Sequence, residues 1–202
     1  MKKYAILIMM ALMFAFAVNG FSQKDNFSVG PRVGVNFANV SNVPGSEANT
    51  GIVLGLTSTY SINEFSGISM DVLYSQEGYE LMDNMEMELN YLQIPRHYNV
   101  FFGQLGEKFR PKVYAGIAPG FLLSAEANET DVAPSYKNTV FSFSGGLGFN
   151  YRIANRIWLN TDLRSQIGLT DIREEAFQTN DIIAPRNFQL SVGVAFGLSR
   201  LD

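Results

Sequence analysis

The sequence predicts an all-β protein, a closed antiparallel up-and-down transmembrane β-barrel of eight strands. Three observations carry this prediction. Apolar and polar residues alternate over most of the chain after residue 26, and this is the period of a β-strand. The alternating segments number eight, and single-chain bacterial barrels have an even number of strands. Each segment also reaches the roughly 9–11 residues that a tilted strand needs to cross a bilayer.

Each alternating segment has one apolar face and one face of small or polar residues. A polar second face suits a narrow hydrated interior, whereas a soluble lipid-binding barrel carries its apolar face inward. Helical periodicity is nearly absent, and the segment 91–102 is the least regular of the set. The expected strands cover residues 27–37, 51–62, 67–78, 91–102, 112–124, 138–152, 157–169 and 187–199.

The first 22 residues have the features of a cleaved secretory signal peptide. Lys2 and Lys3 precede an apolar run that ends at Val18, and the small residues Gly20 and Ser22 follow. The run is shorter than the roughly 20 apolar residues of a membrane-spanning helix. We therefore expect residues 1–22 to be removed and residues 23–202 to form one outer membrane β-barrel domain.

The composition of the remaining chain excludes several classes of protein. Loss of the two lysines leaves 13 basic and 19 acidic residues, a net charge of −6, which argues against nucleic acid as a partner. The chain contains no cysteine, so neither disulfides nor a cysteine metal site stabilises it. We expect no cofactor and no metal site.

The expected connections alternate in length, which orients the barrel. Outer-membrane barrels have short periplasmic turns and long outer loops. Segments 39–50, 79–90, 125–137 and 170–186 would then lie outside, and they hold 12 of the 19 acidic residues. The bases expected at the periplasmic end are Lys24, Lys108, Arg110, Lys112, Arg152, Arg156 and Arg200.

The acidic outer loops are one candidate site. They could bind divalent cations that bridge to lipopolysaccharide, or dock a protein partner, and the methionine-rich run 81–88 suits an adaptable contact surface. The alternative is that their charge only keeps the loops soluble. The candidate residues are Asp83, Glu86, Glu88, Asp131, Glu174 and Glu175.

Polar residues with inward parity form the second candidate site. They could form a constriction that selects solutes, or a network of ion pairs and hydrogen bonds that fills the barrel. Eight strands leave an interior just wide enough for side chains, which favours the filled interior. The candidates are Arg32, Asp71, Glu77, Asn160, Asp162, Arg164 and Gln166.

Residues around Pro95 raise two further questions. His97 is the only histidine and has inward parity, but no Ser–His–acid spacing accompanies it, so we expect the protein not to be an enzyme. Strict alternation would place Arg96 in the lipid belt at a cost of about 2–4 kcal/mol. We therefore predict a β-bulge near Pro95, which would shift the parity.

Aromatic residues near the expected strand ends suggest anchors at the membrane interfaces. Trp158 is an exception, because its inward parity favours packing at the periplasmic mouth. The other residues of this kind are Phe27, Phe37, Tyr60, Tyr91, Phe102 and Tyr151.

Short motifs give the mature region a family resemblance. The stretches GPRVGVN (30–36), DVLYSQEGY (71–79), LQIP (92–95), YAGIAPG (114–120) and GLTDI (168–172) resemble the PorT-like outer-membrane β-barrel family. The resemblance implies a small exported barrel in the outer membrane of a Gram-negative cell. Its motifs are specific for the barrel type and not for an activity.

These observations lead to three hypotheses about function. The first is a membrane-embedded scaffold or interaction protein that acts through its acidic outer loops. The alternative is a narrow passive channel, and the third is an enzyme that modifies lipid A. We expect outer-membrane lipid and lipopolysaccharide as partners, a possible protein partner at the outer loops, and a monomer.

Overall fold

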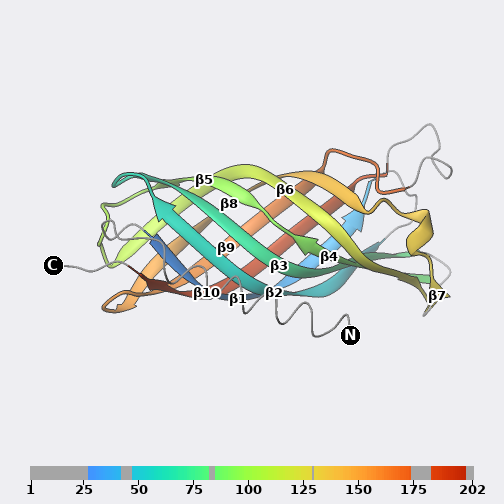
Figure 1. Cartoon of the computed structure of the whole chain (residues 1–202), viewed down its shortest axis with the longest axis horizontal. Helices are drawn as coiled ribbons and strands as arrows, with labels where there is room; N and C mark the ends of the chain where they lie inside the picture. The colour runs from blue at the N-terminus through green and yellow to red at the C-terminus, as the bar shows by residue number, and fades with distance from the viewer. Residues whose placement is uncertain (1–26, 42–46, 82–84, 129, 174–182, 199–202) are drawn as a thin grey trace.

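The fold is seen in a computed structural model that describes residues 27–41, 47–81, 85–128, 130–173 and 183–198 (Figure 1). The expected signal peptide lies outside the described residues. The elements in chain order are β1 (Phe27–Val40), β2 (Glu47–Ser61), β3 (Ser66–Leu81), β4 (Met85–Gln93), β5 (Arg96–Phe101), β6 (Phe109–Ala127), β7 (Thr130–Asp131), the 3-10 helix η1 (Ala133–Ser135), β8 (Thr139–Ala154), β9 (Ile157–Gly168) and β10 (Pro185–Gly197).

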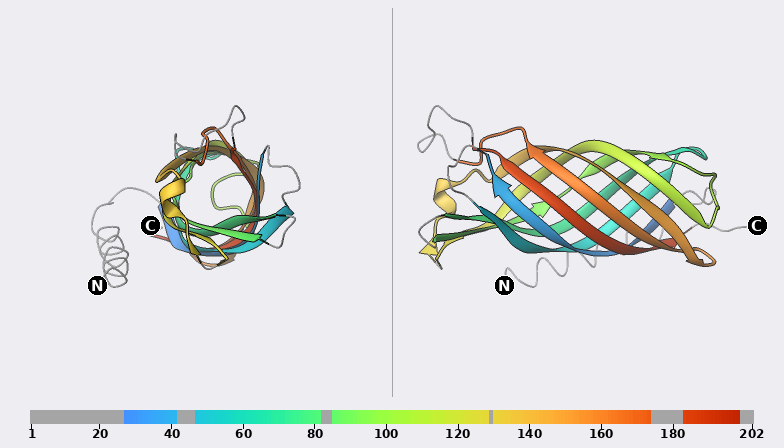
Figure 2. Two further views of the ribbon diagram at one scale, coloured as in Figure 1. Left: turned by 90° about the vertical axis from the view of Figure 1, so that its right-hand side faces the viewer. Right: turned by 180° about the vertical axis from the view of Figure 1, so that it is seen from behind.

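The strands form a ring in which every neighbour is antiparallel. β1 pairs with β2 on one side and with β10 on the other, and β2 also pairs with β3. β4 and β5 each pair with both β3 and β6, so together they occupy one place in the ring. The remaining pairs are β6–β8, β8–β9 and β9–β10. This arrangement confirms the predicted all-β, up-and-down barrel, which Figure 2 shows end-on.

Alternation places apolar side chains outside and polar ones inside. Outward residues such as Leu54, Ile117 and Leu147 are 54%, 50% and 58% exposed, whereas inward residues such as Asn36 and Ser144 are buried. A ring of strands satisfies its own backbone hydrogen bonds, which allows its outer wall to be apolar. In the described residues, no helix has the length and apolar character to cross a membrane.

Several strands extend further than expected. The segment 79–90, expected as a long loop, is instead the end of a hairpin in which Tyr79 of β3 pairs with Met87 of β4. In the described arms of this hairpin Tyr79, Met87 and Leu89 face the interior and are buried, so the alternation of the strands continues in both arms. The loop assignment was wrong because an alternating Met–Glu pattern satisfies a strand as well as an exposed loop.

The predicted bulge near Pro95 is also wrong. Leu73 pairs with Gln93 and Met70 with Arg96, so the register along β3 is continuous across the gap between β4 and β5. The backbone amide of Asp71 donates to the Pro95 carbonyl at 3.0 Å, and proline therefore removes one donor without inserting a residue. Arg96 consequently faces outward and is exposed, paired in the ladder with Met70 and Ile117.

A register shift occurs elsewhere on the same strand. It lies where Asn90 and Tyr91 of β4 meet Ser124 and Leu122 of β6. On β6, both Leu122 and Ala125 pack into the barrel, so the parity changes between these two residues. Such a change is the signature of one extra residue in the strand, a β-bulge.

The two ends of the barrel differ. One end carries the connections that follow β1, β3, β6 and β9, together with β7 and η1, and we call it the outer end (at the right in Figure 1). The other end carries the connections 62–65, 102–108 and 155–156, the start of β1 and the end of β10, and we call it the inner end. Each connection lies at the end where it was predicted, but the predicted alternation of lengths fails at one place, because the outer connection 82–84 is shorter than the inner connection 102–108.

Candidate functional site

An ion cluster occupies the middle of the barrel interior. Asp162 of β9 forms ion pairs with Arg32 of β1 at 2.5 Å and with Lys112 of β6 at 2.8 Å. Asp71 of β3 binds Arg164 of β9 at 2.6 Å and lies 3.9 Å from Arg32. All five side chains are 1–6% exposed, so the cluster joins five charges from four strands inside the barrel.

Hydroxyl groups complete this cluster. Thr57 donates to Asp71 Oδ1 at 2.6 Å and accepts from Arg32 at 3.2 Å, and Ser191 accepts from Arg32 at 3.2 Å. Buried charges persist only when they are paired and hydrogen-bonded in this way. The cluster thus ties β1, β2, β3, β6, β9 and β10 together across the interior.

A second polar group lies beside the ion cluster, centred on Glu77. Its Oε1 accepts from Gln93, and it also accepts from Ser75 at 3.0 Å. The Gln166 side-chain amide donates to the side-chain oxygen Oε1 of Gln93 at 3.0 Å. Of the seven predicted interior residues, four therefore lie in the ion cluster, Glu77 and Gln166 lie in this second group, and Asn160 lines a separate cavity near the inner end.

Each group also depends on a residue that was not predicted from the sequence. Lys112 was predicted only as one of the bases of the inner end, yet it is 6% exposed and forms an ion pair with Asp162. Its even position on β6 matches that of inward Tyr114, and this parity could have identified it. Gln93, which links Glu77 to Gln166, was missed because segment 91–102 alternates poorly.

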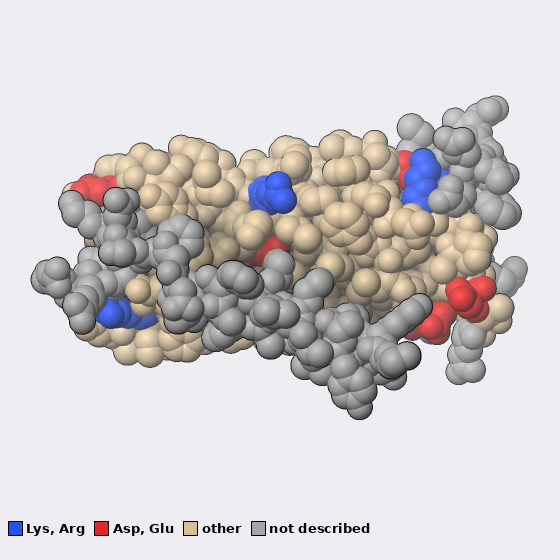
Figure 3. All heavy atoms as spheres, viewed as in Figure 1, with Lys and Arg blue, Asp and Glu red and all other residues tan. Residues whose placement is uncertain are grey.

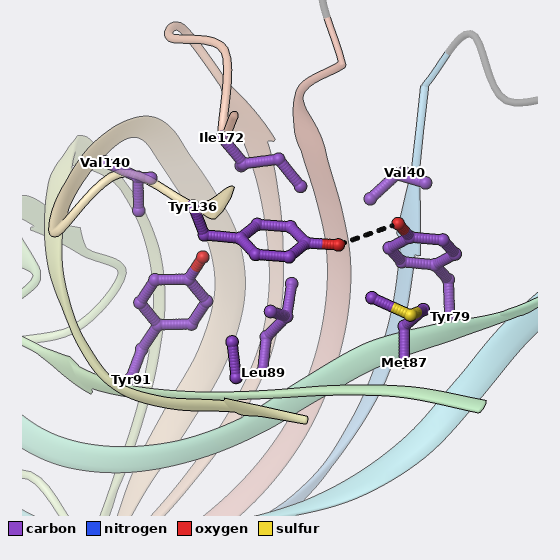
Figure 4. Packing of buried hydrophobic residues seen from close by; sticks show 9 residues of the cluster. Val40, Tyr79, Met87, Leu89, Tyr91, Tyr136, Val140 and Ile172 are labelled. Carbon is purple, nitrogen blue, oxygen red and sulfur yellow. Dashed lines mark hydrogen bonds between the residues drawn. The ribbon is translucent and has the colours of Figure 1, made fainter. Parts of the chain in front are cut away.

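An apolar cluster fills the outer end of the interior (Figure 4). It consists of Val40, Tyr79, Met87, Leu89, Tyr91, Ala125, Tyr136, Val140 and Ile172. Tyr91 is 1% exposed within it, so the prediction of an interfacial anchor was wrong for this residue. The parity of the irregular segment around Tyr91 could not be assigned from the sequence.

Two outer connections contribute side chains to this apolar cluster. Tyr136, just after η1, and Ile172 both reach inward, and the Tyr136 and Tyr79 hydroxyls lie 3.1 Å apart. Backbone hydrogen bonds join the connections, with Lys137 donating to Ile172 at 2.8 Å and Ile172 donating to Ile183 at 2.9 Å. Burial and the Tyr79 hydroxyl raise the pKa of Tyr136, so its phenol stays protonated and the contact is uncharged. The outer mouth is thus capped by the chain itself.

The predicted outer-loop residues are only partly visible. Asp83, Glu174 and Glu175 lie outside the described residues, and Glu86 belongs to β4. Glu88 is also in β4, where it accepts from Gln76 at 2.6 Å and from Asn90 at 3.3 Å. Asp131 is exposed and its carboxylate accepts from the amide of Ala133 at 2.9 Å. Among the described residues, no group of three or more metal-ligating side chains comes together.

His97 makes a contact that the sequence did not indicate. Its Nε2 lies 2.8 Å from Ser144 Oγ, and its ring meets Tyr114 edge-on with the centroids 4.9 Å apart. A nucleophilic serine needs a substrate within reach, but Ser144 is 0% exposed. In the described part of the chain no carboxylate hydrogen-bonds to the histidine, so the pair lacks a triad's orienting acid.

Comparisons with known proteins agree with this geometry. Residues 21–174 match the family described as outer membrane protein beta-barrel domain, and the chain belongs to this family. The match spans β1 to β9, and membership of this family makes the ring of strands an outer membrane β-barrel. Comparison with curated protein sequences found no match.

Solved structures of small outer membrane proteins share the fold. Neisserial surface protein A aligns with a TM-score of 0.62 and 16% identity, covering 85% of this chain and 96% of its own. OprG from Pseudomonas aeruginosa aligns with a TM-score of 0.57 and 13% identity, covering 86% and 96%. E. coli outer membrane protein W aligns with a TM-score of 0.53 and 16% identity, covering 88% and 100%. At these identities the likeness concerns the fold alone.

Proposed function

We propose that the protein is a membrane-embedded scaffold or interaction protein that acts through its acidic outer end. The observation that carries this proposal is the obstruction of the interior at two levels. The apolar cluster caps the outer mouth, and the ion cluster fills the middle. An interior obstructed in this way opposes passage through the barrel and supports recognition at the outer surface.

The charge of the outer end supports the same proposal. Glu126 and Asp131 are exposed there, and Glu88 is partly exposed. Figure 3 shows acidic side chains at this end, at the right, next to a wall that is mostly uncharged. Carboxylates beside a membrane can share divalent cations with lipid phosphates. We therefore propose lipopolysaccharide as the partner of the outer end.

A binding measurement tests this proposal. The purified protein in lipid nanodiscs is mixed with lipopolysaccharide and Ca²⁺, and we expect binding that a chelator reverses. The triple variant Glu88→Gln, Glu126→Gln and Asp131→Asn should bind at least about tenfold more weakly. A single exposed ion pair contributes little to the binding free energy, so three carboxylates are removed together. The matched control is Glu64→Gln with Glu107→Gln, which removes acids from the inner end. Equal binding by the triple variant and the wild type would contradict the proposal.

The second candidate function is a narrow passive channel. The observation in its favour is the polar interior, where Arg164 Nε and Nη1 have no hydrogen-bond partner among the described residues. Planar-bilayer recording separates the candidates. We expect no stable conductance steps from the wild type, whereas steps that change on substitution of Arg164 or Asp162 would favour the channel.

Within the outer membrane family we propose PorT-like membership. The motifs at residues 71–79 and 114–120 support it. The first lies in β3 and the second in β6, and both of these strands contribute a residue to the ion cluster. Genes adjacent to that of this protein provide the test. A secretion cluster around it would support the assignment, and a consistent association with an unrelated pathway would count against it.

A further inference from the structure

A cavity of about 290 Å³ opens at the inner end, away from the ion cluster and the apolar cap. β1, β2, β6, β8, β9 and β10 and the connections 102–108 and 155–156 contribute to its lining. Its volume is at the lower bound for small-molecule pockets, which run from about 300 to 1,000 Å³. The cavity therefore has room for one small molecule.

Three arginines and no acidic residue line this cavity: Arg110, Arg152 and Arg156. Among the described residues, neither Arg152 nor Arg156 has an ion-pair partner. Like charges that share a concave site with low-dielectric walls raise the local potential and attract an anion. The charge of the cavity thus selects for a negative ligand.

Side-chain contacts position Arg110, and backbone hydrogen bonds position the chain at Arg152 and Arg156. Arg110 is 3% exposed, donates to the Glu64 carbonyl at 2.7 Å, and stacks with its Cζ 4.1 Å from the Phe101 ring centroid. The amide of Arg152 donates to Lys108 at 2.8 Å, and the Arg156 carbonyl accepts from Gly197 at 2.8 Å. The guanidinium of Arg110 is therefore held in advance, which lowers the cost of binding, whereas the backbone bonds fix only where Arg152 and Arg156 leave the chain.

Two further residues of the lining indicate which other chemical groups the ligand carries. Trp158 lines the cavity with its ring 5.8 Å from Arg152 Cζ, and a flat aromatic face suits the apolar face of a sugar or polyol. Asn150 Oδ1 is buried and has no hydrogen-bond partner among the described residues. A buried acceptor of this kind calls for a donor, such as a hydroxyl group.

We propose that the inner mouth of the barrel binds a small hydroxyl-bearing organic anion, in which a carboxylate or phosphate meets Arg152 and Arg156 and a hydroxyl meets Asn150. The inner end faces the periplasm if the long connections face outward, as in other outer-membrane barrels. The site is separate from the outer end, so it stands or falls independently of the proposed function.

Intrinsic fluorescence tests this site directly, because Trp158 is the only tryptophan in the chain. The purified full-length protein in detergent micelles is titrated with gluconate, with glucose 6-phosphate and with glucose. We expect a saturable change with at least one anion and a far weaker response to glucose. A preference between gluconate and glucose 6-phosphate distinguishes the carboxylate from the phosphate.

Charge variants provide the decisive comparison. Arg152→Gln combined with Arg156→Asn should raise the Kd at least about tenfold, the size of one charge-assisted hydrogen bond. Asparagine is chosen for Arg156 because φ is 64° there and asparagine tolerates that conformation. The matched control, Lys137→Gln with Arg186→Gln, removes two charges from the outer end and should leave the Kd within about twofold, because screening weakens distant charges.

Several outcomes would overturn the proposal. They are no saturable response to either anion, equal binding of glucose, an unchanged Kd in the inner double variant, or equal weakening in the outer control. If the inner double variant does not fold, Arg156→Asn alone carries the same comparison, because it lies in a two-residue turn and keeps the strand residues intact.

Discussion

Tyr79 and Tyr136 approach each other hydroxyl to hydroxyl at 3.1 Å, the first from strand β3 and the second from the connection that crosses the outer mouth. This contact joins a chain segment outside the strands to the wall of the barrel. Below it lies the ion cluster, so the interior is obstructed by two structures that do not share a residue.

Substitution of Tyr136 tests the cap. Tyr136→Ala should detach the connection and speed proteolysis within residues 128–138 strongly, since loss of a buried aromatic ring costs about 3–5 kcal/mol. Tyr136→Phe keeps the ring and should cost only about 0.5–1.5 kcal/mol. Neither variant should conduct in planar bilayers, because the ion cluster remains. Conductance from Tyr136→Ala alone would show that the ion cluster does not obstruct the interior.

Asp162 is the residue on which the ion cluster depends most. Asp162→Asn should lower the free energy of unfolding by about 3–5 kcal/mol, because Arg32 and Lys112 are then buried without their shared carboxylate. Unfolding in denaturant from lipid vesicles measures the change. Adding Lys112→Met to this variant removes one of the unpaired cations and should restore part of the loss. A purely additive double variant would contradict the coupling.

Substitution of Arg96 should increase the stability of the barrel, whereas substitution of Asp162 should decrease it. Arg96 is the first residue of β5, it is exposed on the outer wall, and it pairs with Ile117 near the middle of β6. Arg96→Leu should raise the free energy of unfolding by up to about 2–4 kcal/mol, the cost of an arginine at the bilayer midplane. Arg186→Leu, at the outer end, is the control and should give little gain. A loss of stability in Arg96→Leu would mean that Arg96 is bound by a partner in the membrane.

We expect the local stability of the outer end to depend on pH through Asp171. Burial opposes ionisation, but hydrogen bonds from Arg173 and from the Ile183 amide hold the pKa of Asp171 below its usual value. The stabilisation is therefore present above the pKa of the unfolded chain and is lost as the pH falls through the folded value. Hydrogen-exchange protection at the Arg173 and Ile183 amides should drop in that acidic range. In Asp171→Asn this protection should be lower at neutral pH and should not change with pH.

Much of the fold could be predicted because one rule governs most strands. In β9, the alternation of Asn160, Asp162, Arg164 and Gln166 with apolar residues assigned every side chain to its face, and all four are buried. The rule is strong because lipid on one side and a narrow interior on the other make a one-residue shift very unfavourable. The same rule fails where both faces are mixed, as around Tyr91.

The errors have a common physical origin. The β3–β4 hairpin was assigned as a loop because acidic residues, which a lipid-facing wall would exclude, alternate with its methionines. Pro95 suggested a bulge because proline often marks one, but a missing amide at one position leaves the register of both neighbours intact. The pairing of Arg32 with Asp162, and the division of the interior into a cap, a cluster and a cavity, depend on which strands face each other across the ring. A single sequence does not contain that information in any local pattern.

The length of the strands has a consequence for recognition. β6 runs for 19 residues and β3 for 16, where roughly 9–11 suffice to cross a bilayer. The excess raises a rim of hydrogen-bonded sheet above the lipid, with Glu88 already fixed by Gln76 and Asn90. A partner that binds this rim meets side chains whose conformational entropy was lost during folding. Association there is correspondingly less costly than binding to a chain that must first become ordered.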